Sequence, residues 1–264
     1  MRTARRDRFE SLAGKVALVT GAATGIGRAT GALLAASGMQ VYGIGGDAVD
    51  GHELAHEAAK RGEPIQFQEV DIRDDAAVRD AVAAAVDTYG RLDSVVNAAG
   101  IYLSGKRAEH VGDDEWDLTL GVNLAGTFRV CRAALPEIRT AGGGAIVNIA
   151  SVHALATVSM VPAYAASKGG VVALSRQLAL DYAADRIRVN ALIVGSVDTR
   201  MTRPSVEPPG WPESVGLSFA PTAVPRIADP TEIASVIAFL LSDSASFITG
   251  SGLVADGGMT ALLF

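Results

Sequence analysis

The chain has 264 residues, a formal net charge of −6, 49% hydrophobic residues and 20% charged residues. This combination predicts a soluble globular protein with room for one α/β domain and a large core. It argues against nucleic acid or an anionic membrane as a partner, and no apolar run reaches the length of a membrane span. Cys131 is the only cysteine, so no disulfide can form within the chain and we expect a reducing compartment, the cytoplasm.

The first 13 residues are rich in arginine and lack the apolar core of a signal peptide. We therefore expect residues 1–13 to form a flexible basic arm and residues 14–264 to form the folded domain. The apolar, β-branched run at residues 15–20 predicts a buried first strand.

A glycine-rich turn follows that strand directly and leads into a helical segment. Its glycines are Gly21, Gly25 and Gly27, with Thr24 and Ile26 between them. Glycines allow a backbone to approach a pyrophosphate closely, and a helix N-terminus offers free N–H groups and a positive dipole end. Strand, glycine turn and helix together predict a dinucleotide-binding site, although the spacing G-x-x-x-G-x-G differs from the commoner G-x-G-x-x-G.

The rest of the chain alternates strands with helices and shows no internal repeat or linker. This alternation predicts an α/β fold: a single doubly wound Rossmann domain with a parallel sheet of about seven strands and helices on both faces. The expected strands after the first are residues 40–44, 64–70, 92–96, 144–150, 187–193 and 252–255, and the expected helices include residues 50–60, 76–89, 113–140 and 229–242.

Polar and small residues follow several of these strands at their carboxyl ends, where ligands bind in open α/β sheets. Asp71 and Ile72 follow the third strand, residues 97–100 (NAAG) end the fourth, and Ser151 follows the fifth. Asn123 lies inside an expected helix, where its amide competes for backbone hydrogen bonds. We therefore expect its side chain to bind another polar group.

Tyr164 and Lys168 stand four residues apart in a segment of helical pattern. Residues at this spacing share one helix face, and an ammonium beside a phenol favours the phenolate. This pair therefore predicts a tyrosine that transfers protons near neutral pH. The alternative for the pair alone is two solvated residues on a helix surface.

Residues 195–227 form a long stretch with six prolines, and such loops are often functional. We expect residues 197–227 to form a substrate lid with an apolar inner face that includes Met201 and Trp211. Four scattered histidines and one cysteine show no spacing suited to a metal site. Among the histidines, only His153, next to Ser151 in the chain, is expected near the substrate.

In these motifs the chain resembles the short-chain dehydrogenase/reductase family over about residues 12–260. The resemblance is carried by TGAATGIG at residues 20–27, Asp71, NAAG, Asn123, Ser151, Tyr164, Lys168, RVNA at residues 188–191 and the final DGG. It implies NAD(P)-dependent interconversion of a secondary alcohol and a ketone.

The resemblance also implies roles for single residues. Tyr164 is the expected general acid or base, Lys168 lowers its pKa and holds the nicotinamide ribose, and Ser151 binds the reacting oxygen. Asn123 anchors a water that connects Lys168 to a proton relay. The expected cofactor contacts are Gly21, Thr24, Gly25, Ile26, Gly27, Asp47, Asp71, Ile72, Asn97, Ala98, Gly100, Tyr164, Lys168, Val197 and Thr199, and the expected substrate contacts are Tyr102, His153, Met201 and Trp211.

Two positions depart from the family pattern. Val194 stands where relatives commonly have proline, which leaves the following loop less constrained. Gly45 stands where NAD-preferring relatives carry an acidic residue, and no cation for a 2′-phosphate is evident nearby. We expect Asp47 to bind the ribose and to favour NAD over NADP; the alternative is that Asp47 only caps the next helix.

A non-catalytic dinucleotide-binding sensor or scaffold is the alternative function, although binding alone needs none of the proton-transfer residues. A small-molecule alcohol or ketone is the expected partner. The resemblance, with the apolar run at residues 259–264, implies a homotetramer, with a dimer as the second possibility.

Overall fold

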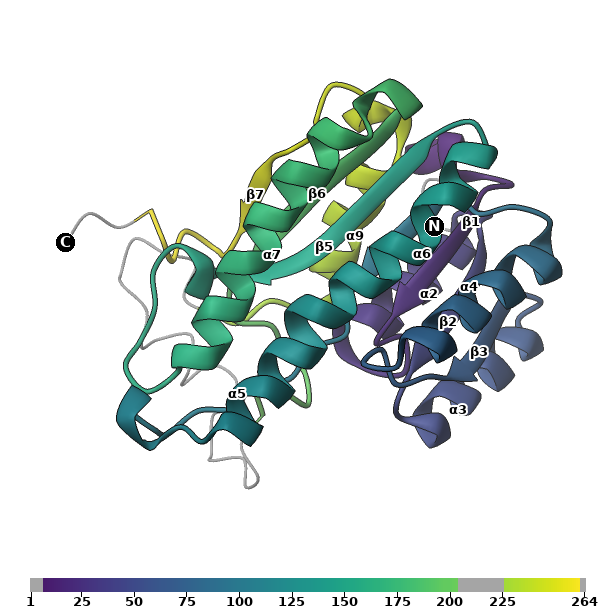
Figure 1. The fold of residues 1–264 in the computed structure, drawn as a ribbon. Helices are drawn as coiled ribbons and strands as arrows, with labels where there is room; N and C mark the ends of the chain where they lie inside the picture. The colour runs from purple at the N-terminus through teal and green to yellow at the C-terminus, as the bar shows by residue number, and fades with distance from the viewer. Residues whose placement is uncertain (1–6, 204–225, 262–264) are drawn as a thin grey trace.

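The computed structural model describes residues 7–203 and 226–261, in which seven strands form one parallel sheet (Figure 1). The strand order is β3-β2-β1-β4-β5-β6-β7. This arrangement confirms the predicted doubly wound fold. The strands are β1 (Val16–Thr20), β2 (Gln40–Gly45), β3 (Ile65–Glu69), β4 (Ser94–Asn97), β5 (Gly144–Ser151), β6 (Ile187–Val194) and β7 (Gly252–Ala255).

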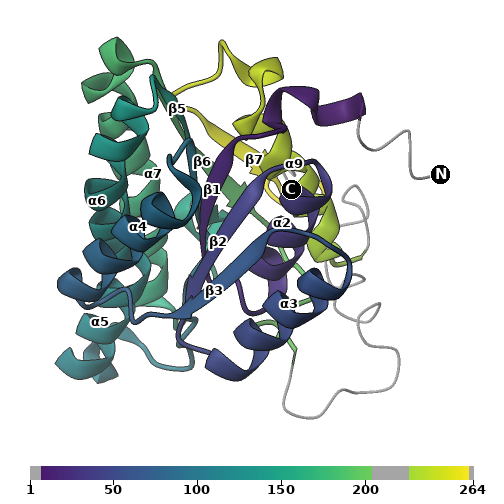
Figure 2. The same ribbon diagram turned by 90° about the vertical axis from the view of Figure 1, so that its right-hand side faces the viewer.

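Helices cover both faces of the sheet (Figure 2). One face carries α2 (Gly25–Ala36), α3 (Ala48–Lys60) and α9 (Pro230–Leu241). The other carries α4 (Asp75–Tyr89), α6 (Thr127–Thr140) and α7 (Pro162–Asp181), with α5 (Asp113–Leu120) before α6. Short helical turns complete the described chain: η1 (Asp7–Leu12), η2 (Ala108–His110), η3 (Gly121–Gly126), η4 (Val152–Ala154), η5 (Ala183–Asp185) and η6 (Asp243–Ala245).

The burial of each strand follows from its place in the sheet. All five residues of the central strand β1 are buried, because helices cover both of its faces. The edge strand β3 alternates instead, with Ile65 and Phe67 buried and Gln66 exposed. The other edge strand, β7, is apolar but only partly buried.

The chain reverses its direction of winding between β1 and β4, which are neighbours in the sheet. The helices that follow them leave on opposite faces, so a crevice opens beyond the carboxyl ends of these two strands. The glycine turn after β1 and the NAAG turn after β4 border that crevice.

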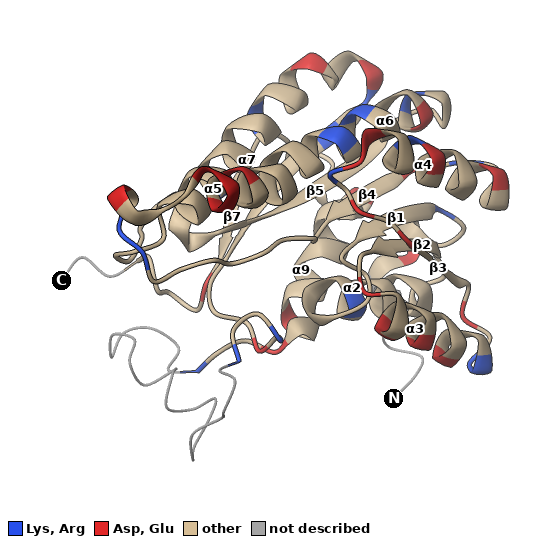
Figure 3. Ribbon diagram, turned by 60° about the horizontal axis from the view of Figure 1, so that its bottom comes forward, with Lys and Arg blue, Asp and Glu red and all other residues tan. Residues whose placement is uncertain are grey.

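Charges on the outer helices are distributed unevenly. Figure 3 shows acidic residues along α3, α4 and α5 and basic residues on α6. Arg132 of α6 pairs with Asp75 at the start of α4, which links two helices on one face of the sheet. This ion pair is partly exposed, so it contributes little to stability and mainly aligns the two helices.

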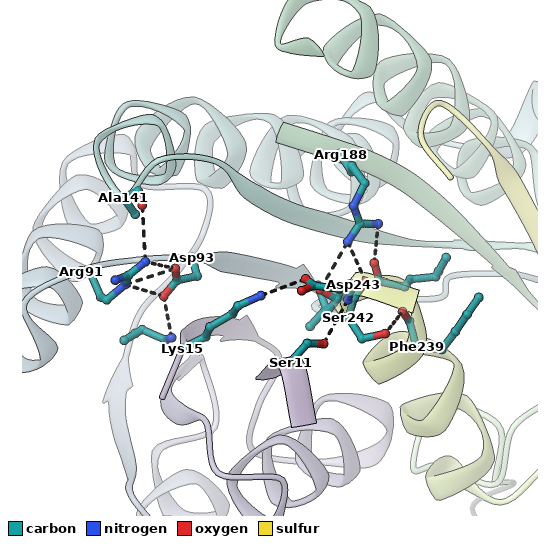
Figure 4. Close-up of polar contacts among 12 residues, drawn as sticks. Ser11, Lys15, Arg91, Asp93, Ala141, Arg188, Phe239, Ser242 and Asp243 are labelled. Atoms are coloured by element: carbon teal, nitrogen blue, oxygen red, sulfur yellow. Dashed lines mark hydrogen bonds and ion pairs between the residues drawn. The ribbon is translucent and has the colours of Figure 1, made fainter. Parts of the chain in front are cut away.

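A separate polar cluster lies at the amino-terminal ends of the strands (Figure 4). The buried carboxylate of Asp93 accepts a hydrogen bond of 2.9 Å from the backbone N–H of Val16 and pairs with Arg91. Arg188 donates to the carbonyl oxygens of Leu240 and Ser242, at 2.7 and 3.1 Å. A cation at these carbonyls stabilises the C-terminal end of α9.

The structure differs from the expected flexible arm at residues 7–12. They form the helical turn η1, which packs against α9, and Phe9 and Leu12 lie in the core. Burial of these two apolar side chains stabilises the turn against the rest of the domain. Residues 1–6 lie outside the described part of the chain.

The burial of Leu12 gives a direct test of this packing. We expect Leu12→Ala to lower the free energy of unfolding by about 2–5 kcal/mol, because it leaves a cavity in the core. Urea unfolding measures the change. Glu10→Ala is the matched control on the exposed side of the same turn and should change stability by less than about 0.5 kcal/mol. Equal effects of the two substitutions would show that η1 is not anchored as described.

Candidate active site and cofactor groove

The glycine turn after β1 lies against the turn after β4. A Cβ atom on Gly21, whose φ is +64°, would stand 2.9 Å from the Cα of Ala99. A Cβ atom on Gly27 would stand only 2.1 Å from the carbonyl oxygen of Gly21. Both positions therefore require glycine, and the backbone stays open to a ligand at the N-terminus of α2.

Two cavities meet at this turn and share Gly21, Thr24 and Gly100. The first, of about 500 Å³, is lined by Asp47, Asp71 and Ile72 among others. The second, of about 160 Å³, extends to Tyr164 and Lys168 and also includes Ile26, Ala98 and Thr199. The two cavities follow one another along the crevice, as the adenosine half and the nicotinamide half of an extended dinucleotide would. The residues therefore fit such a cofactor.

Asp71 and Asn97 were both predicted as cofactor residues and occupy different environments. Asp71 is half-exposed in the first cavity and forms a two-pronged ion pair with Arg73, which lowers its pKa. Asn97 is buried below the crevice and donates a hydrogen bond of 2.8 Å to the side-chain oxygen of Asn148. Asn97 therefore supports the end of β4 from beneath.

Tyr164 and Lys168 lie in the first two turns of α7, which packs on β5 and β6. Lys168 is buried, and its Nζ donates a hydrogen bond of 2.9 Å to the carbonyl oxygen of Ile149. The same Nζ stands 5.7 Å from the centre of the Tyr164 ring. The helix thus brings a phenol and an ammonium to the carboxyl end of β5.

Burial controls the acidity of both groups. It raises the pKa of Tyr164, and a hydrogen bond with Ser151 acts in the opposite direction. Burial also lowers the pKa of Lys168 to about 8. That Lys168 lowers the pKa of Tyr164 stays a prediction, because the shift of the phenol is set here by its burial and by Ser151 and Tyr102. Removal of the phenolate from water outweighs the stabilising contacts.

Asn123 lies in a π-helical turn, η3, that interrupts the predicted helix of residues 113–140. Its amide forms a two-way pair with Ile101, at 2.8 Å to the N–H and 2.9 Å to the carbonyl, and it donates to Ser167 at 3.1 Å. The widened turn lets a fully buried asparagine satisfy its amide with partners outside its own helix. Asn123 thereby ties the NAAG turn to α7.

Two rings contact the phenol ring of Tyr164. The ring of Tyr164 meets those of Tyr102 and His153 edge-on, with centroids 4.8 and 5.4 Å apart. Ser151 lies at the base of this group, where its Oγ accepts from the N–H of His153. Nδ1 of His153 is 2.8 Å from Oγ1 of Thr157, and burial lowers the pKa of the imidazole. The structure therefore brings together four of the predicted catalytic and substrate residues.

The segment after β6 lies over the N-terminus of α2. A Cβ atom on Gly25 would stand 2.9 Å from Cγ2 of Thr199. Val197 is buried and pairs with Ala228 in a β-bridge, and Met201 lines the second cavity. Trp211 and the rest of the predicted lid at 204–225 lie outside the described residues.

Asp47 caps α3, which was the alternative reading of this residue. One carboxylate oxygen accepts from the N–H of Asp50 at 3.2 Å, and the other accepts from Arg200 at 2.8 Å. Arg200 also pairs with the carboxylate of Asp50. Local sequence patterns do not predict this ion pair, because 153 residues separate Arg200 from Asp47. The position of Arg200 directly after Thr199, a predicted cofactor contact, is the feature of the sequence that places it near the groove.

The described ranges 7–203 and 226–261 contain no group of three His, Cys, Asp or Glu side chains arranged to hold a metal ion. In the same ranges, none of the helices combines the length and apolar character needed to cross a membrane.

Residues 21–260 match a family model described as enoyl-(acyl carrier protein) reductase. A D-threitol dehydrogenase of Mycolicibacterium smegmatis is 40% identical over 250 residues, which cover 94% of both chains. A cyclopentanol dehydrogenase of Comamonas sp. is 36% identical over 247 residues, covering 94% of this chain and 97% of that one. The chain belongs to the short-chain dehydrogenase/reductase family.

The same relationship appears among solved structures. The crystal structure of a carveol dehydrogenase from Mycobacterium avium in complex with NAD has a TM-score of 0.89, 30% sequence identity, and coverage of 96% of this chain and 99% of that chain. The chain is thus an oxidoreductase that interconverts a secondary alcohol and a ketone with a nicotinamide dinucleotide. Nothing among these relatives supports the alternative of a non-catalytic sensor or scaffold.

Proposed function

We propose that this enzyme interconverts compact alicyclic secondary alcohols and their ketones, uses NAD, and transfers the proton through Tyr164. The observation that carries the proposal is the convergence of Tyr164, Ser151 and the buried Lys168 at the crevice beside the glycine turn. A buried phenol there can exchange a proton with an oxygen of the substrate.

The bound cofactor supplies the hydride chemistry, and the protein supplies orientation and the proton. Tyr164 gives its proton to the carbonyl oxygen in reduction and takes the hydroxyl proton in oxidation. The hydroxyl of Ser151 binds the same oxygen and disperses its developing charge. Asn123 acts as a positioning residue, because its amide joins the NAAG turn to Ser167 on α7.

The surroundings of the phenol support a compact and largely apolar substrate. Tyr102 and His153 present rings on two sides of Tyr164, and Met201 lines the cavity beside it. The relatives include cyclopentanol and cyclohexanol dehydrogenases, whose named substrates are small rings with one hydroxyl. A panel of cyclopentanol, cyclohexanol and D-threitol tests this part of the proposal.

Removal of the phenol hydroxyl tests the catalytic assignment. We expect Tyr164→Phe to keep NADH binding, measured by fluorescence titration, and to lose about 10²–10⁴-fold in turnover of cyclopentanol or of the best panel substrate. The reason is that only the proton-transfer group is removed. Turnover within a few-fold of the wild type would assign the proton transfer to another residue.

The raised pKa of Tyr164 predicts opposite pH profiles for the two directions. Oxidation needs the phenolate, so its kcat/KM should rise with pH through neutrality into the alkaline range. Reduction needs the phenol, so its kcat/KM should stay level through neutrality and fall only at alkaline pH. Steady-state rates from about pH 6 to about pH 11 show both profiles. A plateau of the oxidation rate below neutral pH would contradict the assignment.

The preference for NAD follows from the charges at the adenosine end. Gly45 and Gly46 offer no side chain, and Asp47 lies beside them in the same cavity. Within residues 7–203 and 226–261, the guanidinium that contacts Asp47 is that of Arg200, which is shared with Asp50. Asp47, Asp50, Glu69 and Asp71 outnumber the two guanidinium groups of Arg73 and Arg200 here. The site is therefore net negative, which repels a 2′-phosphate and accepts ribose hydroxyls.

We expect kcat/KM to be at least about tenfold higher with NAD than with NADP, and Asp47→Ala to narrow that ratio. Asp74→Ala is the matched control, because Asp74 caps α4 as Asp47 caps α3. It removes a helix cap and should leave the cofactor ratio unchanged. A tenfold preference for NADPH in the wild type would overturn the proposal.

We further propose that the enzyme is a cytoplasmic homotetramer, with a dimer as the second possibility. Large apolar side chains are partly exposed on α5 and α6, among them Trp116 at 39% and Phe128 at 41%, and association would cover them. Light scattering of the full chain at micromolar concentration should give a tetramer mass. A stable monomer would refute this assembly.

A further inference from the structure

Arg200 contacts the start of α3 beside the cofactor groove. Arg200 comes from the segment after β6, and its Nη1 lies 2.8 Å from a carboxylate oxygen of Asp47. Its Nη2 pairs with Asp50, one turn further along α3. The guanidinium therefore joins the segment after β6 to the start of α3.

The cavities locate this contact along the length of the cofactor. Arg200 lines the second cavity together with Tyr164 and Lys168, whereas Asp47 lines the first cavity, at the adenosine end. The Gly21 and Thr24 turn borders both cavities. Arg200 thus stands where the two halves of a dinucleotide join, which is the position of the pyrophosphate over the N-terminus of α2.

The neighbouring arginine of α2 is already engaged. Arg28 donates to the carbonyl oxygens of Ala23 and Asp50, at 3.4 and 3.1 Å, and its Nη2 pairs with Glu57 at 2.9 Å. The side chain of Arg200, in contrast, is 69% exposed. An exposed ion pair contributes little to the fold, so its guanidinium can exchange partners at low cost.

We propose that Arg200 is a cofactor-binding residue that exchanges the carboxylate of Asp47 for the pyrophosphate of the bound dinucleotide. A guanidinium has five N–H donors, so it can bind a phosphate and keep its contact with Asp50. The exchange frees the carboxylate oxygen of Asp47 that now binds Arg200. That oxygen then accepts a hydrogen bond from the ribose.

The exchange of partners by Arg200 affects both the segment after β6 and the carboxylate of Asp47. It closes the segment that carries Thr199 and Met201 over the cofactor, and it prepares Asp47 for the ribose. This inference deepens the proposed function and rests on it only where the ribose contact of Asp47 assumes NAD. The contact between Arg200 and the pyrophosphate would form with either NAD or NADP.

Binding of ADP and adenosine tests the proposal without catalysis. ADP carries the diphosphate and adenosine does not, and isothermal titration calorimetry measures both with the full chain. We expect Arg200→Ala to weaken ADP at least about tenfold, as loss of a charged hydrogen bond does, and to change adenosine binding less than about twofold. Arg200→Lys should retain part of the ADP affinity, because a point charge replaces the fork.

Arg61→Ala is the matched control. A third cavity, of about 1160 Å³, lies beside α2 and α3 and is lined by both Arg61 and Arg200. Arg61 lines neither of the two cavities that meet at the glycine turn, and it pairs with Glu63, two residues along the chain. This variant makes the same change in net charge away from the groove and should leave ADP binding within about twofold.

Three results would overturn the proposal: unchanged ADP affinity in Arg200→Ala, equal losses for ADP and adenosine, or an equal loss in Arg61→Ala. The second result would mean that Arg200 only shapes the start of α3. Failure of the proposed function is seen separately, as absence of alcohol turnover by a wild-type enzyme that still binds ADP.

Discussion

The burial of one ammonium group, that of Lys168, organises the functional end of the molecule. A charge removed from water is tolerated only where hydrogen bonds replace its hydration, and the carbonyl of Ile149 supplies one. This contact fixes α7 against the end of β5. Tyr164, one turn earlier on the same helix, is therefore held beside Ser151, the last residue of β5. The same burial sets the acidity of both groups, since it disfavours the charged form of each.

The π-helical turn at Asn123 allows a second polar group to be buried with its hydrogen bonds satisfied. A regular helix would present the amide of Asn123 with no free backbone partner, because each N–H and carbonyl is already paired. The wider turn directs it to Ile101 and Ser167. Gly100 lies directly above: a Cβ atom there would stand 3.3 Å from Oδ1 of Asn123 and 3.5 Å from Nζ of Lys168. Helix irregularity and a small residue thus create one buried polar centre below the crevice.

The electrostatics of the groove differ between its two ends. Tyr164 and Lys168 are buried, their pKa values are shifted by desolvation, and Lys168 has a fixed partner in the carbonyl of Ile149. At the adenosine end the charges are exposed, and Arg200 is shared by two carboxylates. Buried groups keep one geometry because breaking it leaves an unsatisfied charge, whereas exposed pairs exchange partners readily. The proposed function places proton transfer at the first kind of site and a cofactor that must enter and leave at the second.

The sequence alone determined the fold class, the glycine turn and the Tyr164–Lys168 pair, because these depend on local patterns: apolar runs, glycines at fixed spacing and residues on one helix face. It did not reveal that Phe9 and Leu12 anchor the N-terminal turn, that η3 widens around Asn123, or that burial raises the pKa of Tyr164. Nor did it reveal that Arg200 reaches Asp47. These features depend on contacts between residues far apart in the chain and on the desolvation those contacts cause, and only the tertiary structure decides both.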